Sequence, residues 1–454
     1  MSLEKQVLTI NITTMKSKVR FALVLALLGA SSLGASAQFA EIQYHNKNDQ
    51  YGKNRFETSK KDSVAYTGQK LRVGAGFTQS FQTLKHSNNP NVVNGVDQNK
   101  LTPIENGFGL ASANMTFDAQ LADGVKLNLT LYLAARHHNE TWVKGGYVQM
   151  DKLPFIKGEF FDNLMKYTTI KVGHMEINYG DAHFRRTDNG NSILNPFAEN
   201  LIMDAFATEI AGEVEVKYNS FLGVAGLSNG LLKGDVIEKT NTATGETRAK
   251  KPSIYGKVGF DGYPVDGWRV RVTQSGYYNG GSTRNTLYAG DRGGSHYWGV
   301  LTNSTDLTAN FTTGRFSPGF DYQVSSLMTN LFTKYHGLEF FGTYEWAKGR
   351  PYTNAATQVD KRKVNQIAGD LLYYFGEKEN FYVGARYNKL SGELLPTAMD
   401  ASITRNAFAA GYFFTKNILL KAEYVKQKYN GFPTNNLYNG GKFDGLVVEA
   451  VVGF

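Results

Sequence analysis

The 454-residue chain contains no cysteine, which excludes disulfides, thiolate catalysis and cysteine-based zinc or iron–sulfur sites. Hydrophobic residues make up only 41% of it and the mean hydropathy is −0.35, so a large dry core combined with helical membrane spans is not expected. Beyond Gln38 no apolar run approaches the ~18 residues that indicate a transmembrane helix. The chain is therefore polar on average, and no membrane-spanning helix is predicted after Gln38.

Aromatic residues and glycine are abundant instead, with 26 Tyr, 29 Phe and 48 Gly. Long twisted strands, interfacial aromatic girdles and tight turns use these residue types. The stretch VKLNLTLYLAAR at 125–136 shows the pattern, because Leu127, Leu129, Leu131 and Leu133 alternate with polar side chains. A period of two indicates a β-strand with one apolar and one polar face.

The N-terminus has the features of an export signal. Three basic residues precede the apolar run FALVLALLGA at 21–30, and the small residues that follow end in Ala35-Ser36-Ala37. This order is typical of a secretory signal peptide, and the run is shorter than the ~20 residues of a membrane anchor. Residues 1–37 are therefore predicted to be removed, with Met15 as an alternative start. Removal takes four basic residues and one acidic residue, so the formal net charge falls from +9 to +6.

Alternating segments recur to the end of the chain and predict sixteen strands, an even number. Their predicted ranges are 71–82, 107–121, 125–136, 141–151, 168–178, 208–218, 220–228, 253–261, 268–279, 323–335, 338–348, 363–375, 380–390, 402–415, 418–429 and 442–454. Many are longer than the strands of a soluble sandwich, which average about five or six residues. Because strands in hydrocarbon must pair all their backbone groups, the expected fold is all-β: a closed transmembrane antiparallel β-barrel over 71–454.

The connections between these strands alternate between short and long, as expected when one end of a barrel faces the periplasm and the other the outside. The stretch FIKGEFFDNLMKY at 155–167 is the exception among the short ones and predicts a small amphipathic helix. Among the long ones, 179–207 is the third external loop and 280–322 is long enough to be a second occluding element. The polar segment 38–70 is either a flexible periplasmic segment or a partly ordered plug.

The stretches RNAFAAGYFFTKNILLKAEYVKQKYNGF at 405–432 and GGKFDGLVVEAVVGF at 440–454, with KVGHMEINYGDAHFRRTDNGNSILNPF at 171–197, carry a family resemblance. They resemble outer-membrane porins of Bacteroidota, which are distantly similar to the phosphate-selective porins O and P. The resemblance implies a sixteen-stranded barrel and permits a homotrimer. Independently of it, the alternating final stretch that ends in Phe454 looks like the recognition signal that outer-membrane barrels offer the barrel assembly machinery. These motifs build a scaffold and do not identify the solute.

The third loop supplies candidate site residues. In general porins this loop folds inward and narrows the pore, so Arg185 and Arg186 are predicted near the constriction, with Asp181 and Asp188 close by. Opposed charges across a water-filled neck sort solutes by sign. The alternative is that the two arginines are a solvated pair in an external loop.

Strand parity predicts which charged side chains face the barrel interior, here called the lumen. Ten cations oppose six carboxylates, which favours anions mildly, although a slip of one residue in register would reverse a face. The cations are Arg72, Lys126, Arg136, Lys171, Lys257, Arg269, Arg271, Arg386, Arg405 and Lys421, and the carboxylates are Glu209, Glu213, Glu215, Asp370, Glu423 and Glu449.

Three function classes stay open. The leading one is a porin for small polar solutes with a mild preference for anions, including phosphate. The second, a barrel lipase or protease, would need a Ser/His/Asn or Asp/His grouping near the rim, and no spacing singles out any of the eight histidines. The third is a structural barrel with an occluded lumen inside a larger envelope complex with protein partners.

No catalytic residue and no cofactor are predicted. No metal site is predicted either, because the pair His137 and His138 has no further spaced ligands and is best explained as part of a loop. Outer-membrane lipid is an expected partner and nucleic acid is not.

Overall fold

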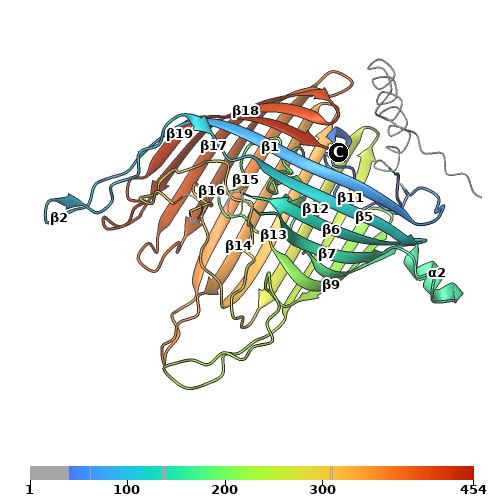
Figure 1. Cartoon of the computed structure of the whole chain (residues 1–454), viewed down its shortest axis with the longest axis horizontal. Helices are drawn as coiled ribbons and strands as arrows, with labels where there is room; N and C mark the ends of the chain where they lie inside the picture. The colour runs from blue at the N-terminus through green and yellow to red at the C-terminus, as the bar shows by residue number, and fades with distance from the viewer. Residues whose placement is uncertain (1–39, 62, 135–139, 307, 309) are drawn as a thin grey trace, which may run out of the picture.

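The structure is a computed structural model that describes residues 40–454 except 62, 135–139, 307 and 309. The predicted signal peptide at 1–37, Arg136 and the His137-His138 pair lie outside the described residues. The described chain forms a closed sixteen-strand antiparallel barrel with long connections at one end (Figure 1). The barrel closes because β1 pairs with β19 on one side and with β5 on the other.

The barrel strands follow one another in chain order, each pairing with its neighbours. They are β1 (Lys70–Ser87), β5 (Ser112–Ala122), β6 (Val125–Leu133), β7 (Trp142–Met150), β8 (Thr168–Glu176), β9 (Thr208–Tyr218), β10 (Phe221–Ser228), β11 (Ser253–Val265), β12 (Trp268–Asn279), β13 (Gln323–Tyr335), β14 (Leu338–Arg350), β15 (Arg362–Phe375), β16 (Phe381–Gly392), β17 (Ala401–Thr415), β18 (Ile418–Asn430) and β19 (Lys442–Gly453). The predicted fold class and strand number are confirmed.

One predicted strand is divided. Residues 107–121 form the short β4 (Gly107–Phe108), which pairs with β1, and then β5. Gly109 lies between them, where its N–H donates to the carbonyl of Ser80 and a side chain would collide with the indole of Trp298. Because Trp298 comes from the connection 280–322, periodicity could not reveal this break. A small hairpin of β2 (Val92–Val93) and β3 (Val96–Asp97) extends from the connection after β1.

The strands keep one face apolar and exposed and the other polar and buried. On β6, Leu127 and Leu129 are 38% and 36% exposed, whereas Lys126 is 6% exposed. A closed barrel with an apolar outer face satisfies its backbone internally and can sit in lipid, as outer-membrane barrels do. We therefore assign the protein to an outer membrane. Within the described residues, no helix is both long and apolar enough to span a membrane.

The short connections gather at one end of the barrel, which for an outer-membrane barrel is the periplasmic end. Asn219 between β9 and β10 and His336 between β13 and β14 adopt positive φ angles of 53° and 50°, as tight hairpin turns require. The predicted helix is present as α2 (Glu159–Met165), between β7 and β8. It projects from that end (Figure 1), with Phe160 and Leu164 exposed.

An arginine on the outer face of β6 tests the assignment of that face to lipid. Leu129→Arg places a charge midway along the strand and should lower the free energy of unfolding by about 2–4 kcal/mol, whereas Val265→Arg at the end of β11 should cost only about 0–1 kcal/mol. Equilibrium unfolding in lipid vesicles measures both losses. Equal losses for the two variants would contradict the assignment.

Candidate functional site

The connection between β8 and β9, residues 177–207 and here called loop three, folds into the lumen. Its backbone is held by side chains of the far wall: the N–H of Ala198 donates to Glu423 at 2.9 Å and that of Ile202 to Asn388 at 2.7 Å. The Nζ of Lys421 donates to the carbonyls of Ser192, Asn195 and Phe197. Wall side chains therefore supply the hydrogen bonds that this irregular backbone needs.

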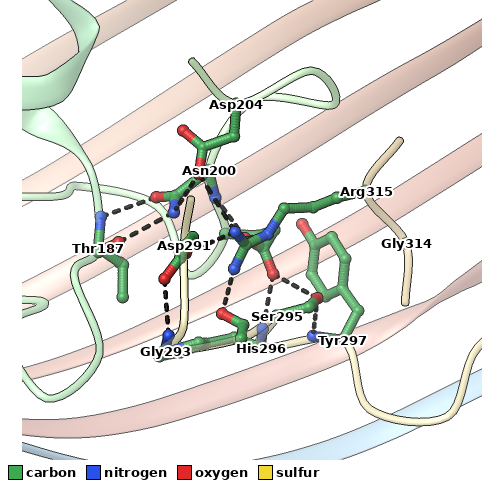
Figure 2. A network of polar contacts seen from close by, with 12 residues as sticks. Thr187, Asn200, Asp204, Asp291, Gly293, Ser295, His296, Tyr297, Gly314 and Arg315 are labelled. Atoms are coloured by element: carbon green, nitrogen blue, oxygen red, sulfur yellow. Dashed lines mark hydrogen bonds and ion pairs between the residues drawn. The ribbon is translucent and has the colours of Figure 1, made fainter. Parts of the chain in front are cut away.

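The connection between β12 and β13, residues 280–322 and here called loop five, also enters the lumen and packs on loop three. The hydroxyl of Ser295 and the N–H of His296 donate to Glu199 of loop three at 2.5 and 2.6 Å. Figure 2 shows Arg315 directed toward Asp204 and Asp291, so that one cation joins the two loops. The expectation that 280–322 is a second occluding element agrees with this placement.

Arg186 lies at the centre of the contact between the two loops. Its guanidinium is 2.5 Å from Asp204 and 2.7 Å from Asp291, and it stacks 3.8 Å from the ring centroid of Phe206. Burial alone would lower the pKa of Arg186, but the two carboxylates outweigh burial and raise it. The same pairing lowers the pKa of Asp291 below its ordinary value, against the effect of burial. Arg186 therefore acts as a charged link between loops three and five.

Arg185 points to a different wall. It pairs with Glu339 of β14 at 2.7 Å, contacts the amide of Asn54, and lies 4.8 Å from the ring centroid of Phe341. Burial works against its charge, yet Glu339 raises the pKa of Arg185 above the ordinary value. With a 5% exposed side chain, Arg185 is enclosed by protein.

The two predicted aspartates are also paired. Asp181 contacts Arg271 at 2.8 Å and Lys257 at 2.9 Å, and these cations outweigh burial to hold the pKa of Asp181 at about 2. Asp188 pairs with Lys144 of β7 and is 3.7 Å from Arg186. The four predicted residues thus lie inside the barrel, each beside opposite charge, and their role at a constriction stays a prediction.

The predicted lumen charges within the described residues also face inward. Lys126, Arg271, Arg386, Arg405, Lys421 and Glu449 are buried, and Arg72 and Arg269 are half-buried. Arg386 pairs with Asp370 at 2.6 Å and Lys421 with Glu449 at 3.0 Å, whereas Arg405 is bonded by neutral oxygen atoms. Pairing on this scale reduces the positive field that a simple count of lumen charges suggests.

Phe454 lies at the seam of the barrel. Its backbone exchanges hydrogen bonds with Ala75 of β1 at 3.0 and 3.1 Å, next to the pairing of β1 with β19. Its predicted role as an assembly signal stays a prediction.

Beside loop three a cavity of about 320 Å³ remains along the inner wall of β5 to β8. Its lining is polar and of both charge signs. The ionisable residues that line it are His45, Glu57, Asp118, Lys126, Lys144, Tyr147, Lys171, His174, Glu176, His183 and Asp188. The cavity extends from the N-terminal segment at the periplasmic end to Phe206 and Thr208 near the outer end. We take this cavity as the candidate functional site.

Several residues of the site could not be found from the sequence. The N-terminal segment contributes His45, Phe56 and Glu57 to the cavity lining, and Glu199, Asp204 and Arg315 make the contact between loops three and five beside it. These are charged or aromatic residues in irregular stretches without periodicity. The one signal in the sequence is that the long connections contain many charged and aromatic residues, which indicates that these connections are more than solvated loops. Within the described residues, no group of three or more potential metal ligands is present.

The structure is similar to solved outer-membrane proteins at low sequence identity. The anion-selective porin from Comamonas acidovorans is 11% identical, with 85% of this chain and 100% of that chain covered and a TM-score of 0.48. The outer membrane channel DcaP of Acinetobacter baumannii is 12% identical, with 86% and 99% covered and a TM-score of 0.48. OmpT of Vibrio cholerae is 10% identical, with 86% and 99% covered and a TM-score of 0.47. No protein-family model and no curated protein matches the chain.

Removing the link between the two loops should loosen both. Arg186→Ala removes one of the two cations that Asp204 and Asp291 share and leaves only Arg315 beside them, and breaking a buried pair from one side costs up to about 3–5 kcal/mol. We expect much faster hydrogen exchange in residues 187–207 while the strands stay protected. The matched control is Arg284→Ala, an exposed arginine of loop five, which should leave exchange unchanged. Equal exchange in the two variants would contradict the assigned link.

The contact of loop five with β19 should depend on pH. His296 hydrogen-bonds Glu449, and although burial and Lys421 oppose its charge, Glu449 and Glu199 raise the pKa of His296. A raised folded-state pKa means that the contact stabilises loop five fully below the unfolded pKa and is lost as pH rises through the folded value.

The measurement is the hydrogen-exchange protection factor of residues 294–300 over a pH series. Protection should fall as the pH rises, and His296→Gln should flatten this dependence. An unchanged slope in His296→Gln would assign the pH dependence to other groups.

Proposed function

We propose that the protein is an outer-membrane porin through which small polar solutes diffuse along the inner wall of β5 to β8. The observation that carries the proposal is the polar cavity beside loop three, inside a closed barrel of outer-membrane type. Ionisable and amide side chains along its length can replace part of the hydration shell of a solute. No reaction step belongs to this proposal.

The proposal includes a mild preference for anions, with phosphate among them. Lys126, Lys144 and Lys171 on β6, β7 and β8 line the cavity, opposite carboxylates that include Asp188. Lys144 and Lys171 are paired with carboxylates, but Lys126 donates to the backbone carbonyl of Tyr44 at 2.5 Å. Arg72 likewise donates to the ring of His45 at 3.1 Å. These two cations keep more of their field than the paired ones, which supports weak anion selectivity.

Two further features of the proposal rest on the resemblance noted in the sequence. A homotrimer is one, and light scattering of the detergent-solubilised protein would determine the oligomer. Membership of a family related to the phosphate-selective porins is the other. The predicted constriction at Arg185, Arg186, Asp181 and Asp188 belongs here as well, with the paired arginines holding loop three in position.

The alternative is a structural barrel with an occluded lumen in a larger envelope complex. The filling of the lumen by loops three and five favours it, because Arg186 and Arg315 bind the two loops into one unit. Folded, heat-modifiable protein that gives no conductance, but retains envelope proteins on purification, would support this alternative over a porin.

Single-channel conductance in planar bilayers tests the proposal. We expect discrete current steps, a reversal potential under a KCl gradient on the anion side, and partial block by added phosphate. Lys126→Gln should move the reversal potential toward cations because it removes a cavity cation that has no carboxylate hydrogen bond among the described residues. The matched control is Lys348→Gln on the outer face of β14, which should leave it unchanged. Identical reversal potentials in the two variants would contradict a passage along β5 to β8.

A further inference from the structure

The N-terminal segment, residues 40–61, crosses the periplasmic end of the barrel. Gln43 bonds to Asp123 in the β5–β6 turn, and on the opposite side the side chain of Gln50 donates to the carbonyls of Lys378 and Glu379 in the β15–β16 turn. The N–H of Gln50 also donates to the carbonyl of Lys416 at 2.8 Å. Residues 40–61 therefore span the mouth of the barrel between distant turns, near the C-terminus (Figure 1), and are here called the strap.

This strap separates two cavities. The candidate site of about 320 Å³ lies on its lumen side, and a second cavity of about 430 Å³ lies against the β9–β10 turn at Asn219 and Ser220. Asn46, Phe56 and Glu57 line both cavities. The wall between the candidate passage and the periplasmic mouth thus consists, at these residues, of the N-terminal segment and not of the barrel.

The strap is held at its centre by an ion cluster. Glu57, whose side chain is 2% exposed, lies 2.9 Å from Arg271 of β12 and 3.4 Å from Lys257 of β11. Phe56 packs beside it, with its ring centroid 5.4 Å from that of Phe332. Glu57 is therefore the carboxylate of the N-terminal segment that, together with Asp181 of loop three, neutralises these wall cations where the two cavities are divided.

These attachments differ from those of a barrel strand. Within residues 40–61 the only regular structure is the 3-10 turn η3 (Gln50–Gly52), and the segment belongs to no sheet. Its contacts combine the buried side chains of Ile42, Tyr44 and Phe56 with side-chain hydrogen bonds and ion pairs, and the buried ion pairs gain little net free energy because charges must be desolvated. The wall side chains that hold it can be hydrated when it leaves. Such a segment can detach while the barrel stays closed.

We propose that residues 40–61 form a gate at the periplasmic end of the passage, with Glu57 as the latch that keeps it closed. Opening joins the lumen cavity to the periplasmic one. This inference rests on the proposed porin function, since a gate requires a passage.

A disulfide lock tests the gate, and the absence of native cysteine makes such a lock unambiguous. The backbones of Gln50 and Lys416 are hydrogen-bonded, which brings their Cα atoms within the range of about 4.4–6.8 Å that disulfides bridge. In planar bilayers the oxidised Gln50→Cys/Lys416→Cys protein should conduct at least tenfold less than the same protein after reductant is added. Each single cysteine variant should not respond to reductant. Equal conductance of the oxidised and reduced double variant would overturn the gate.

A second variant addresses the latch in the full-length mature protein. Glu57→Gln removes the strap's own charge on Arg271 and Lys257, leaves Asp181 of loop three paired with both, and should raise the fraction of time spent in the open state several-fold. The matched control, Glu41→Gln, removes an exposed carboxylate from the same segment and should leave the open fraction unchanged. The same open fraction in Glu57→Gln and Glu41→Gln would overturn the latch. If wild type, Glu57→Gln and the reduced double variant all fail to conduct, the porin function itself is wrong, and the gate with it.

Discussion

Closure of the hydrogen-bond ladder between β1 and β19 is the constraint on which the rest of the structure depends. In hydrocarbon an unpaired backbone group is costly, so the first and last strands must meet, and they do so from Gly76 to Ser87. Sixteen strands in a closed ring leave an interior too wide for wall side chains alone to fill. Loops three and five and the N-terminal segment occupy much of that space, and their irregular backbone needs polar partners there.

This need explains why the lumen charges are paired. A charge moved into a narrow, protein-filled interior loses hydration, and opposite charge and hydrogen bonds must compensate. Arg186 with Asp204 and Asp291, Arg271 with Asp181 and Glu57, and Lys421 with Glu449 are solutions of this kind. The same residue types that would select ions in an open pore here determine where loops lie. In the proposed porin, selectivity would then depend on the few cations that, within the described residues, have no carboxylate at ion-pair distance, such as Lys126.

Much of this architecture could be predicted from the sequence, because strand parity is a local property. The alternation on either side of Lys126, Arg271 and Lys421 predicts an interior position for each without any knowledge of partners, and all three side chains are buried. The partners themselves could not be predicted. Glu57 and Arg271 are 214 residues apart, and Arg186 and Asp291 are 105 apart, so their pairing depends on how irregular loops fold within the closed ring. The prediction of one continuous strand over 107–121 was wrong for the same reason, since Trp298, which lies against Gly109 at the break, is distant in the sequence.

The position of the cavity follows from which wall holds the loops. Side chains that bond loop three or loop five come mainly from the later strands, among them Glu339, Asn388, Lys421, Glu423 and Glu449. Along the opposite wall the short strands β5 to β8 carry the cavity lining, in which Gly145 of β7 has no side chain to fill the space. Loop three also contacts this wall, where Asp188 pairs with Lys144 of β7, so the cavity is the space left between such contacts. Its periplasmic limit is the N-terminal segment 40–61, which joins no sheet and is anchored largely through side chains to the turns around it.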